Sequence, residues 1–292
     1  MNEAKKIIRE IKLLKILQNE NIISIKDIFE HITSNNIVDI YIVTDLLGTD
    51  LHKVIYSSQV LTKEHIQYMM YQLVIGVYFM HSTNIIHRDL KPSNILLKRN
   101  CDLKICDFGM ARELENNIVL TDYVITRWYR APEVLLSLNN YGKPVDIWSI
   151  GCIFAELLAR KPFIPGRNFL YQIKKIFEII GTPSKEDIIE ISGEIGYKFI
   201  SSIPFVPQPN WNDMLQKANA TEVDLLSKML TFNPKKRITI DECVKHPYFE
   251  GLHEIQFVSQ CLNKYDSNWE TKIFTEEELQ QMFNDLKLSF QY

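Results

Sequence analysis

The octapeptide His87-Arg88-Asp89-Leu90-Lys91-Pro92-Ser93-Asn94 decides how this chain is interpreted. It follows a stretch of helical periodicity over residues 63–81 and leads into a short hairpin predicted over residues 94–105. The octapeptide therefore lies in a loop between two regular elements. Its aspartate and asparagine are residue types that favour turns, so taken singly they fit a structural loop as well as a chemical site.

Two further motifs follow in the same chain, Asp107-Phe108-Gly109 and Ala131-Pro132-Glu133. In this order the three motifs resemble the catalytic core of eukaryotic protein kinases, and Lys91 is typical of the serine/threonine branch. The resemblance implies an α+β, protein-kinase-like fold with a small N-terminal lobe and a larger, mainly helical C-terminal lobe. Within it, we expect Phe108 to pack in the core and His87 to be a structural histidine beside it.

The segment between the last two motifs narrows the resemblance. Thr121-Asp122-Tyr123 is similar to the dual-phosphorylation lip of the mitogen-activated protein (MAP) kinases. The likeness continues through Asp146-Ile147-Trp148-Ser149-Ile150-Gly151-Cys152 and Leu230-Thr231-Phe232-Asn233-Pro234. Residues 274–292 resemble the tail helix that returns to the small lobe in that family. The resemblance thus covers nearly the whole chain from Ala4 onward.

The overall composition excludes several classes of function. The chain has 292 residues and a net charge of −3, so no excess of positive charge favours nucleic acid or an anionic membrane. No apolar run is long enough to span a bilayer, and no signal-peptide core follows Met1. The five cysteines lack metal-type spacing and indicate reduced thiols. We expect a monomer of the cytoplasm and nucleus, with no nucleic-acid or membrane partner.

The pattern of apolar residues predicts the order of the elements. A helix over residues 4–17 is followed by two strands, one near residues 22–25 and one over residues 38–43, and by a linker at residues 45–50. Beyond the linker, periodicity predicts mainly helices, at residues 63–81, 145–159, 169–180, 222–230 and 239–245.

We expect three parts along the chain. Residues 1–46 would form a partial N-terminal lobe of one helix and two strands. Residues 47–250 would form the complete C-terminal lobe with its activation segment and a MAP-kinase-type insert. Residues 251–292 would form an extension that packs back toward the N-terminal lobe.

The resemblance implies a role for each polar residue of the motifs. Asp89 would orient the acceptor hydroxyl and take its proton, and Lys91 would help to neutralise the migrating phosphate. Asn94 and Asp107 would supply hard oxygen ligands for Mg²⁺ bound to ATP. The implied reaction is transfer of the γ-phosphate of ATP to protein sites in which proline follows Ser or Thr.

The resemblance also implies a set of nucleotide contacts. Thr44 would gate the pocket behind adenine, and Asp45 and Leu47 would present backbone groups to the adenine ring. Glu10 matches the helix carboxylate that pairs with an ATP-binding lysine in this family. The full set of implied nucleotide contacts is Glu10, Thr44, Asp45, Leu47, Lys91, Ser93, Asn94, Leu96 and Asp107.

Phosphorylation of Thr121 and Tyr123 by an upstream dual-specificity MAP kinase kinase would switch the enzyme on. Guanidinium groups suit the resulting phosphates. By resemblance, Arg9, Arg88 and Arg112 would gather around phospho-Thr121. Arg127 and Arg130 would hold phospho-Tyr123. Alternatively, Arg88 and Arg112 are ordinary ion-pair partners. Glu133 and Arg237 are expected to form a buried structural bridge.

One family feature is missing from the sequence. No Gly-x-Gly-x-x-Gly loop occurs, Gly48 is the first glycine, and no strand lysine is available for Glu10. Two hypotheses about the function follow. In the first, the chain is an N-terminally truncated MAP kinase, and these 292 residues alone have little kinase activity. In the second, it is a non-catalytic docking module or decoy. In either case, we expect the apolar face that carries Ile7, Ile11 and Leu14 to lack its cover.

Overall fold

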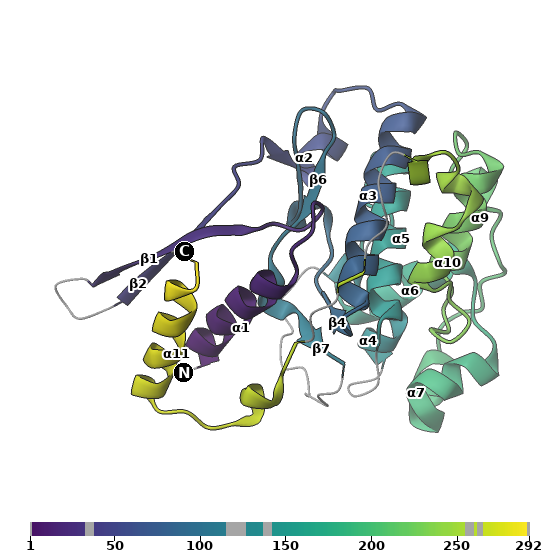
Figure 1. The fold of residues 1–292 in the computed structure, drawn as a ribbon. Coiled ribbons are helices and arrows are strands. Elements are labelled where there is room, and N and C mark those ends of the chain that lie inside the picture. The colour runs from purple at the N-terminus through teal and green to yellow at the C-terminus, as the bar shows by residue number, and fades with distance from the viewer. Residues whose placement is uncertain are drawn as a thin grey trace.

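The computed structural model describes residues 2–32, 38–114, 127–136, 142–254, 260–261 and 265–290. A smaller part, built from the two chain ends, lies beside a larger helical part (Figure 1). Thr121 and Tyr123 lie outside the described residues.

The smaller part contains one helix and a two-stranded ribbon. Helix α1 spans Asn2–Ile16, and strand β1 (Ile25–Ile32) pairs antiparallel with β2 (Val38–Thr44). The strand expected near residues 22–25 was placed too early. The amide of Ile23 bonds to the carbonyl of Ile105 at 2.9 Å, so this stretch is tied to the larger part and the ribbon begins only at Ile25.

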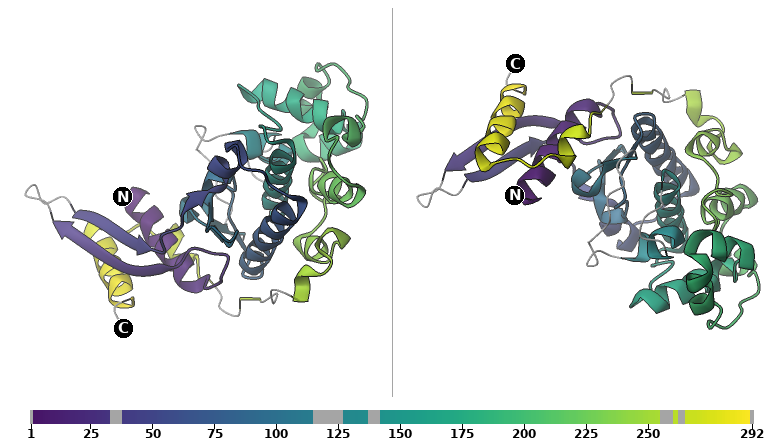
Figure 2. Two further views of the ribbon diagram at one scale, coloured as in Figure 1. Left: turned by 90° about the horizontal axis from the view of Figure 1, so that it is seen from above. Right: turned by 90° about the horizontal axis from the view of Figure 1, so that it is seen from below.

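The expectation of an uncovered apolar face on α1 is wrong. Ile11 is 0% exposed and Leu14 is 2% exposed. Helix α11 (Glu276–Leu288) contacts both α1 and β1, and the views in Figures 1 and 2 show it beside them. A cluster of Ile8, Trp269 and Leu279 closes the interface. The apolar side chains of α1 are therefore covered: Ile8 packs against the C-terminal extension, and Ile11 and Leu14 belong to the main core.

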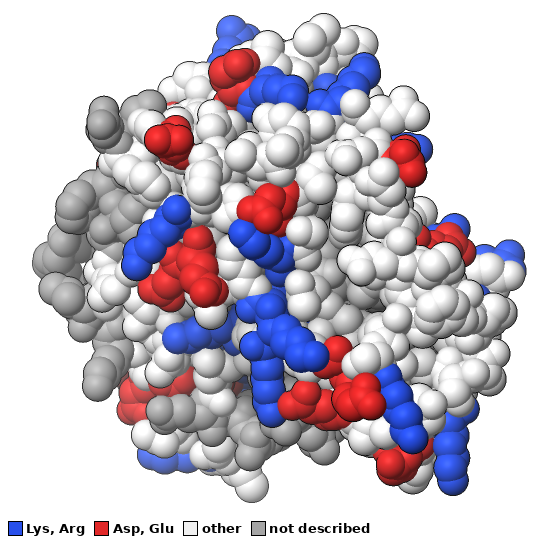
Figure 3. Space-filling model, turned by 90° about the vertical axis from the view of Figure 1, so that its right-hand side faces the viewer, with Lys and Arg blue, Asp and Glu red and all other residues white. Residues whose placement is uncertain are grey.

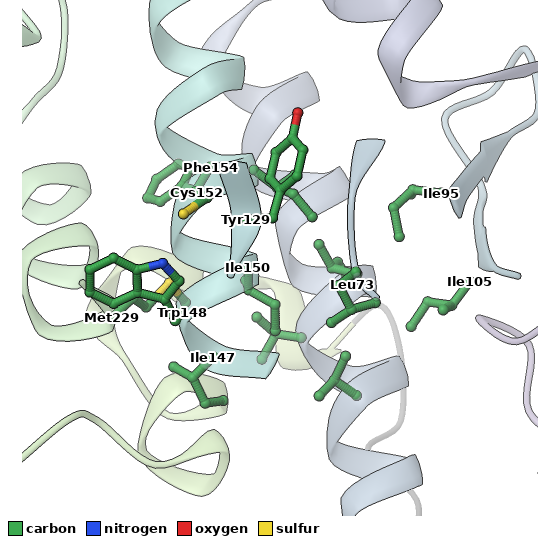
Figure 4. Packing of buried hydrophobic residues seen from close by; sticks show 14 of the residues in the cluster. Leu73, Ile95, Ile105, Tyr129, Ile147, Trp148, Ile150, Cys152, Phe154 and Met229 are labelled. Atoms are coloured by element: carbon green, nitrogen blue, oxygen red, sulfur yellow. The ribbon is translucent and has the colours of Figure 1, made fainter. Parts of the chain in front are cut away.

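The larger part is organised around two long helices. Helix α3 (Lys63–His81) begins where the Thr62 side chain caps its first turn, and helix α5 (Pro144–Ala159) packs against it. Figure 4 shows Leu73 and Ile150 on the facing sides of these helices, and Trp148 on the other side of α5, beside Met229. The remaining helices are α2 (Leu51–Tyr56), α4 (Pro132–Leu136), α6 (Phe169–Ile180), α7 (Lys185–Ile200), α8 (Trp211–Met214), α9 (Ala220–Met229) and α10 (Ile240–Val244).

Short strands hold the loops that carry the sequence motifs. The predicted hairpin is confirmed: β5 (Ile95–Leu97) pairs antiparallel with β6 (Leu103–Ile105), and β3 (Thr49–Asp50) joins β5. Strand β4 (Ile85–Ile86) pairs with β7 (Arg112–Glu113). Because β4 precedes the octapeptide and β7 follows the Asp-Phe-Gly motif, these pairings bring the two motif loops together. Short 3-10 turns complete the described elements at Pro92–Asn94, Phe108–Met110, Arg127–Tyr129, Pro247–Phe249, Leu252–Glu254 and Asn268–Thr271.

The expected structural ion pair is confirmed. Arg237 donates from its two terminal nitrogens to the two carboxylate oxygens of Glu133, at 2.7 and 2.9 Å. On the face drawn in Figure 3, basic side chains form a connected group near the centre, and acidic side chains lie beside it. Among the described residues, no helix combines the length and apolar character needed to cross a bilayer.

Candidate active site

A buried carboxylate fixes the octapeptide loop. Asp146, on α5, accepts hydrogen bonds from the backbone amides of His87 and Arg88 at 2.8 and 2.9 Å, and contacts the His81 ring nitrogen Nε2 at 2.9 Å. Burial works to raise the pKa of Asp146, but its hydrogen bond and charge interaction with His81 outweigh burial and keep the pKa low. The loop leaving β4 is thereby bonded to the core, and Arg88 is held at a φ of 71°.

Three motif residues meet immediately after this anchor. The Oδ2 atom of Asp89 accepts from Lys91 Nζ at 2.7 Å and from Asn94 Nδ2 at 3.2 Å. Asn94 Nδ2 also donates to the Asp89 backbone carbonyl at 2.9 Å. The carboxylate is therefore held in one orientation by a cation and an amide.

The Asp-Phe-Gly motif is tied to the same loop. The backbone amide of Cys106 donates to the carbonyl of Asn94 at 3.0 Å. Asp107, the next residue, therefore begins beside the octapeptide loop. Phe108 is fully buried, with its ring 5.0 Å from the His87 ring, so both expected packing roles are confirmed. Asp107 itself has a φ of 65° and an exposed side chain, which bonds to none of the described residues.

The donor set fits a magnesium ion. Asn94 commits its Nδ2 to Asp89, which leaves its amide oxygen free of any described hydrogen bond, and the Asp107 carboxylate is also unused. The described residues contain no group of three or more His, Cys, Asp or Glu suited to a metal. Mg²⁺ commonly takes only one or two protein oxygens and completes its shell with phosphate and water. The Asn94 amide oxygen and the Asp107 carboxylate would meet that requirement.

Glu10 on α1 lies against the Asp-Phe-Gly motif. Burial and the negative charge of Asp107 raise the pKa of Glu10, and a hydrogen bond from the Phe108 backbone opposes them. Among the described residues, no lysine pairs with Glu10. Lys5 bonds to backbone carbonyls of the C-terminal extension, and Lys6 pairs with Glu3.

The remaining expected nucleotide contacts lie at the end of β2 and in the linker after it, and in the turn and strand β5 that end and follow the octapeptide. Thr44 and Ser93 are exposed, and Leu47 and Leu96 are half-buried. The Asp45 side chain is engaged elsewhere, because it pairs with Lys26 at 3.3 Å and Lys104 at 3.8 Å. Burial works to raise the pKa of Asp45, but these lysines lower it on balance. Any adenine contact at Asp45 is therefore left to its backbone.

The arginines expected near phospho-Thr121 come from helix α1, the octapeptide loop and strand β7. Burial and the charges of Arg9 and Arg88 lower the pKa of Arg112 to about 10. Arg9 forms an ion pair with Glu270, at 2.8 Å from its Nη2. Arg127 and Arg130 are half-buried in or directly after the turn Arg127–Tyr129.

Comparisons with known proteins agree with this geometry. Residues 1–249 match the model of the protein kinase domain family. The chain is 45% identical to mitogen-activated protein kinase 5 of Oryza sativa subsp. indica over 284 residues, covering 97% of this chain and 77% of the relative. The chain belongs to the MAP kinases. It is also 43% identical to mitogen-activated protein kinase 6 of Arabidopsis thaliana, covering 99% of this chain and 73% of that protein.

A third relative, extracellular signal-regulated kinase 1 of Dictyostelium discoideum, is 45% identical, with 99% of this chain and 55% of the relative covered. These matches confirm three expectations: the α+β protein-kinase-like fold, membership of the MAP kinase family and assignment as a serine/threonine protein kinase. Use of ATP and Mg²⁺ is general in the protein kinase family.

Cys106 is a poor nucleophile in this MAP kinase. Its position next to Asp107 left open whether it is a reactive thiol or a plain buried one. Burial and the charges of Asp107 and Glu10 raise the pKa of Cys106 to about 12. Because the thiolate is the reactive form, the structure favours the plain buried thiol.

Sequence reasoning missed two sets of residues around the site. Asp146 and His81 anchor the octapeptide loop, but the sequence indicated Asp146 only as part of a family motif and gave it no role. Glu270 and Tyr265 of the C-terminal extension reach the arginine group. The tail's resemblance to a helix that returns to the small lobe signalled its general position, but not which side chain would reach the arginines.

Proposed function

We propose that this MAP kinase transfers the γ-phosphate of ATP to Ser or Thr followed by Pro, with Asp89 as the group that orients the acceptor hydroxyl and takes its proton. The supporting observation is the Asp89 carboxylate itself. Its Oδ2 is held by Lys91 at 2.7 Å and Asn94 at 3.2 Å, while no described hydrogen bond uses Oδ1. A fixed carboxylate with one free oxygen suits proton acceptance within hydrogen-bond reach of a hydroxyl.

The neighbouring residues receive roles consistent with their chemistry. Asn94 and Asp107 would hold Mg²⁺, which, when bound, neutralises phosphate charge. The Lys91 ammonium, already beside Asp89, would place a positive charge next to the transferred group. The other proposed nucleotide contacts are Glu10, Thr44, Leu47, Ser93 and Leu96, with the backbone of Asp45.

We also propose activation by phosphorylation of Thr121 and Tyr123, catalysed by a dual-specificity MAP kinase kinase. Support comes from the cationic group that would receive the first phosphate. Arg9 Nη1 and Arg112 Nε are buried and have no hydrogen-bond acceptor among the described residues. A phosphate with three acceptor oxygens would supply the missing partners. Arg127 and Arg130 would hold the phosphate on Tyr123.

A polypeptide of residues 1–292 by itself is expected to transfer phosphate slowly. Its sequence contains no Gly-x-Gly-x-x-Gly loop, and Glu10 faces Asp107 rather than a lysine among the described residues. The same observation supports a second candidate function, a kinase-like docking module that binds partners without catalysis.

The experiment compares Asp89→Asn with the control Asp213→Asn, an exposed aspartate on α8. Both chains are treated with an active MAP kinase kinase, and labelled phosphate transfer is measured on a Ser-Pro peptide and its Ser-Ala counterpart. The proposal predicts turnover on Ser-Pro that falls by ~10²–10⁴-fold in Asp89→Asn alone. Equal turnover in both variants would refute the role of Asp89. No turnover by any chain, with partner binding retained, would favour the docking module.

A further inference from the structure

A groove of about 930 Å³ lies in the larger part, apart from the candidate active site. Its walls are the loop of residues 57–61 after α2, the end of α5 and residues 213–218. The described residues that line it include none of the motif residues or proposed nucleotide contacts. Its volume is in the range of protein sites that enclose small ligands. The groove is therefore large enough to receive a side chain of a partner and has no part in the proposed chemistry.

An arginine at the end of α5 fixes the loop wall of the groove. Arg160 follows α5 in the left-handed conformation, with a φ of 55°. Its guanidinium donates to the backbone carbonyls of Val54, Ile55, Ser57 and Gln59, at 3.2, 2.6, 2.7 and 2.9 Å. Because one side chain bonds to four carbonyls, the end of α2 and the loop after it are attached to α5 at several points.

A tyrosine at the end of α2 provides a second anchor. The Tyr56 hydroxyl donates to Oε1 of Glu156 at 2.7 Å, and Glu156 on α5 is buried. Burial and this carboxylate raise the pKa of Tyr56, so its hydroxyl remains a donor. Two side chains thus hold the wall in place without a partner. Binding costs less free energy when the site is already formed.

The floor of the groove is apolar. Ile55, Leu157 and Leu215 line it and are buried. Beside them lies Met214, which is half-buried and has an unbranched side chain that adapts to different neighbours. Val60 lies at the rim and is 80% exposed, although it is apolar. An apolar side chain of a partner would therefore be removed from water by both the floor and Val60.

The rim carries an excess of positive charge. Its charged side chains other than Arg160 are Lys63, Lys161, Lys217 and Asp213. Lys63 is paired with Glu222 at 3.4 Å, whereas Lys161 and Lys217 are exposed and form no ion pair with any described residue. The whole chain has a net charge of −3, so this excess is local. A cationic rim attracts carboxylates and repels a basic partner.

We infer that this groove is a docking site for an acidic segment of a partner protein. An apolar side chain of the segment packs over Leu215 and against Val60, and carboxylates on either side of it meet Lys161 and Lys217. The apolar floor alone does not select such a partner. The two lysines do, because they attract an acidic segment and repel a basic one. The inference concerns binding only and is independent of phosphate transfer at Asp89.

Binding of a model peptide to the whole chain tests the chemistry of the partner. The probe is fluorescently labelled Glu-Asp-Leu-Leu-Asp-Glu, and its fluorescence anisotropy is measured as the chain is added. One counterpart replaces both leucines by serine, and the other replaces all four acidic residues by lysine. We expect the dissociation constant of either counterpart to be at least about tenfold higher. Equal binding of either counterpart would overturn the inference.

Paired substitutions locate the binding surface. Lys161→Glu combined with Lys217→Glu should raise the dissociation constant of the acidic peptide by about tenfold, because two attractions become repulsions. The matched control is Lys198→Glu with Lys245→Glu, two exposed lysines on α7 and directly after α10 that do not line the groove. An equal effect of the two pairs would indicate general attraction between charges and would overturn the inference.

Two measurements decide the matter even if a charge-reversed chain fails to fold. Val60→Ser changes only an exposed side chain and should raise the dissociation constant by about threefold. Carbodiimide joins a carboxylate to a nearby amine, so it should cross-link the peptide to Lys161 or Lys217, as identified by mass spectrometry. Cross-links confined to other lysines, or no saturable binding at about 1 mM peptide, would overturn the inference.

Discussion

Replacing Arg237 by methionine should strongly destabilise the larger, helical part of the kinase. Arg237 is 0% exposed and donates to both oxygens of Glu133. It also donates to the carbonyls of Thr231, Pro144 and Phe232, at 2.9, 2.7 and 3.1 Å. Methionine fills a similar volume but leaves a buried carboxylate and three carbonyl oxygens without these donors. The expected loss is about 3–5 kcal/mol of unfolding free energy, the range for breaking a buried ion pair.

A surface pair in the same region provides the matched control. Lys235 and Glu190 lie 2.6 Å apart but are 78% and 41% exposed, so Lys235→Met should leave the free energy of unfolding almost unchanged. Urea unfolding gives both free energies. In thermal unfolding, the Arg237 variant should melt roughly 6–20 °C lower, at about 2–4 °C per kcal/mol.

A second substitution isolates the cause of the loss. Combining Arg237→Met with Glu133→Leu removes the unpaired carboxylate and should recover part of the lost stability. Equal losses for Arg237→Met and Lys235→Met would refute the reasoning, because they would show that burial does not decide the strength of these pairs. A double variant less stable than Arg237→Met would show that the buried carboxylate is not the source of the cost.

Three further predictions concern the site. Burial and the charge of Asp107 raise the pKa of Glu10 in the folded protein, so the free energy of unfolding should fall as pH rises from about 4.5 through the folded-state pKa. Glu10→Gln should flatten the dependence of the melting temperature on pH. An unchanged slope in the variant would contradict this prediction. Burial raises the pKa of Cys106 from an ordinary value of 9.0 to about 12, so fewer of its thiols are ionised. Since a thiolate of higher pKa is also the stronger nucleophile, Cys106 should react with iodoacetamide roughly 30-fold more slowly than an ordinary thiol. Labelling at the ordinary rate, followed by mass spectrometry, would contradict this. Asp146→Asn should lower the free energy of unfolding in urea by about 2–4 kcal/mol, because it removes the buried charge that accepts from the amides of His87 and Arg88. A loss under about 1 kcal/mol would argue against Asp146 as the anchor of the octapeptide loop.

The long helices could be predicted because two independent signals coincide in them. Helices α3 and α6 follow the apolar periodicity, and each begins after a capping residue, Thr62 or Asn168. The strand expected near residues 22–25 failed because apolar alternation does not reveal the partner. That stretch bonds to Ile105, and no local spacing encodes such a contact.

In the candidate site, too, the contacts between residues close in sequence could be predicted, and those between distant residues could not. Asp89, Lys91 and Asn94 are close in sequence, so one loop suffices to bring them together, and the motif indicated as much. Asp146 is 58 positions from the Arg88 amide that it accepts from, and Glu270 is 261 positions from Arg9. Contacts of that separation depend on how whole elements pack, which no motif states.

The most direct test of the central claim is a crystal structure of the chain with Mn²⁺ and a non-hydrolysable ATP analogue, with the metal located by anomalous scattering. We predict a metal about 2.1 Å from both the Asn94 amide oxygen and the Asp107 carboxylate, with the terminal phosphorus facing Asp89. A metal bound to neither residue, or a terminal phosphate directed away from Asp89, would contradict this prediction.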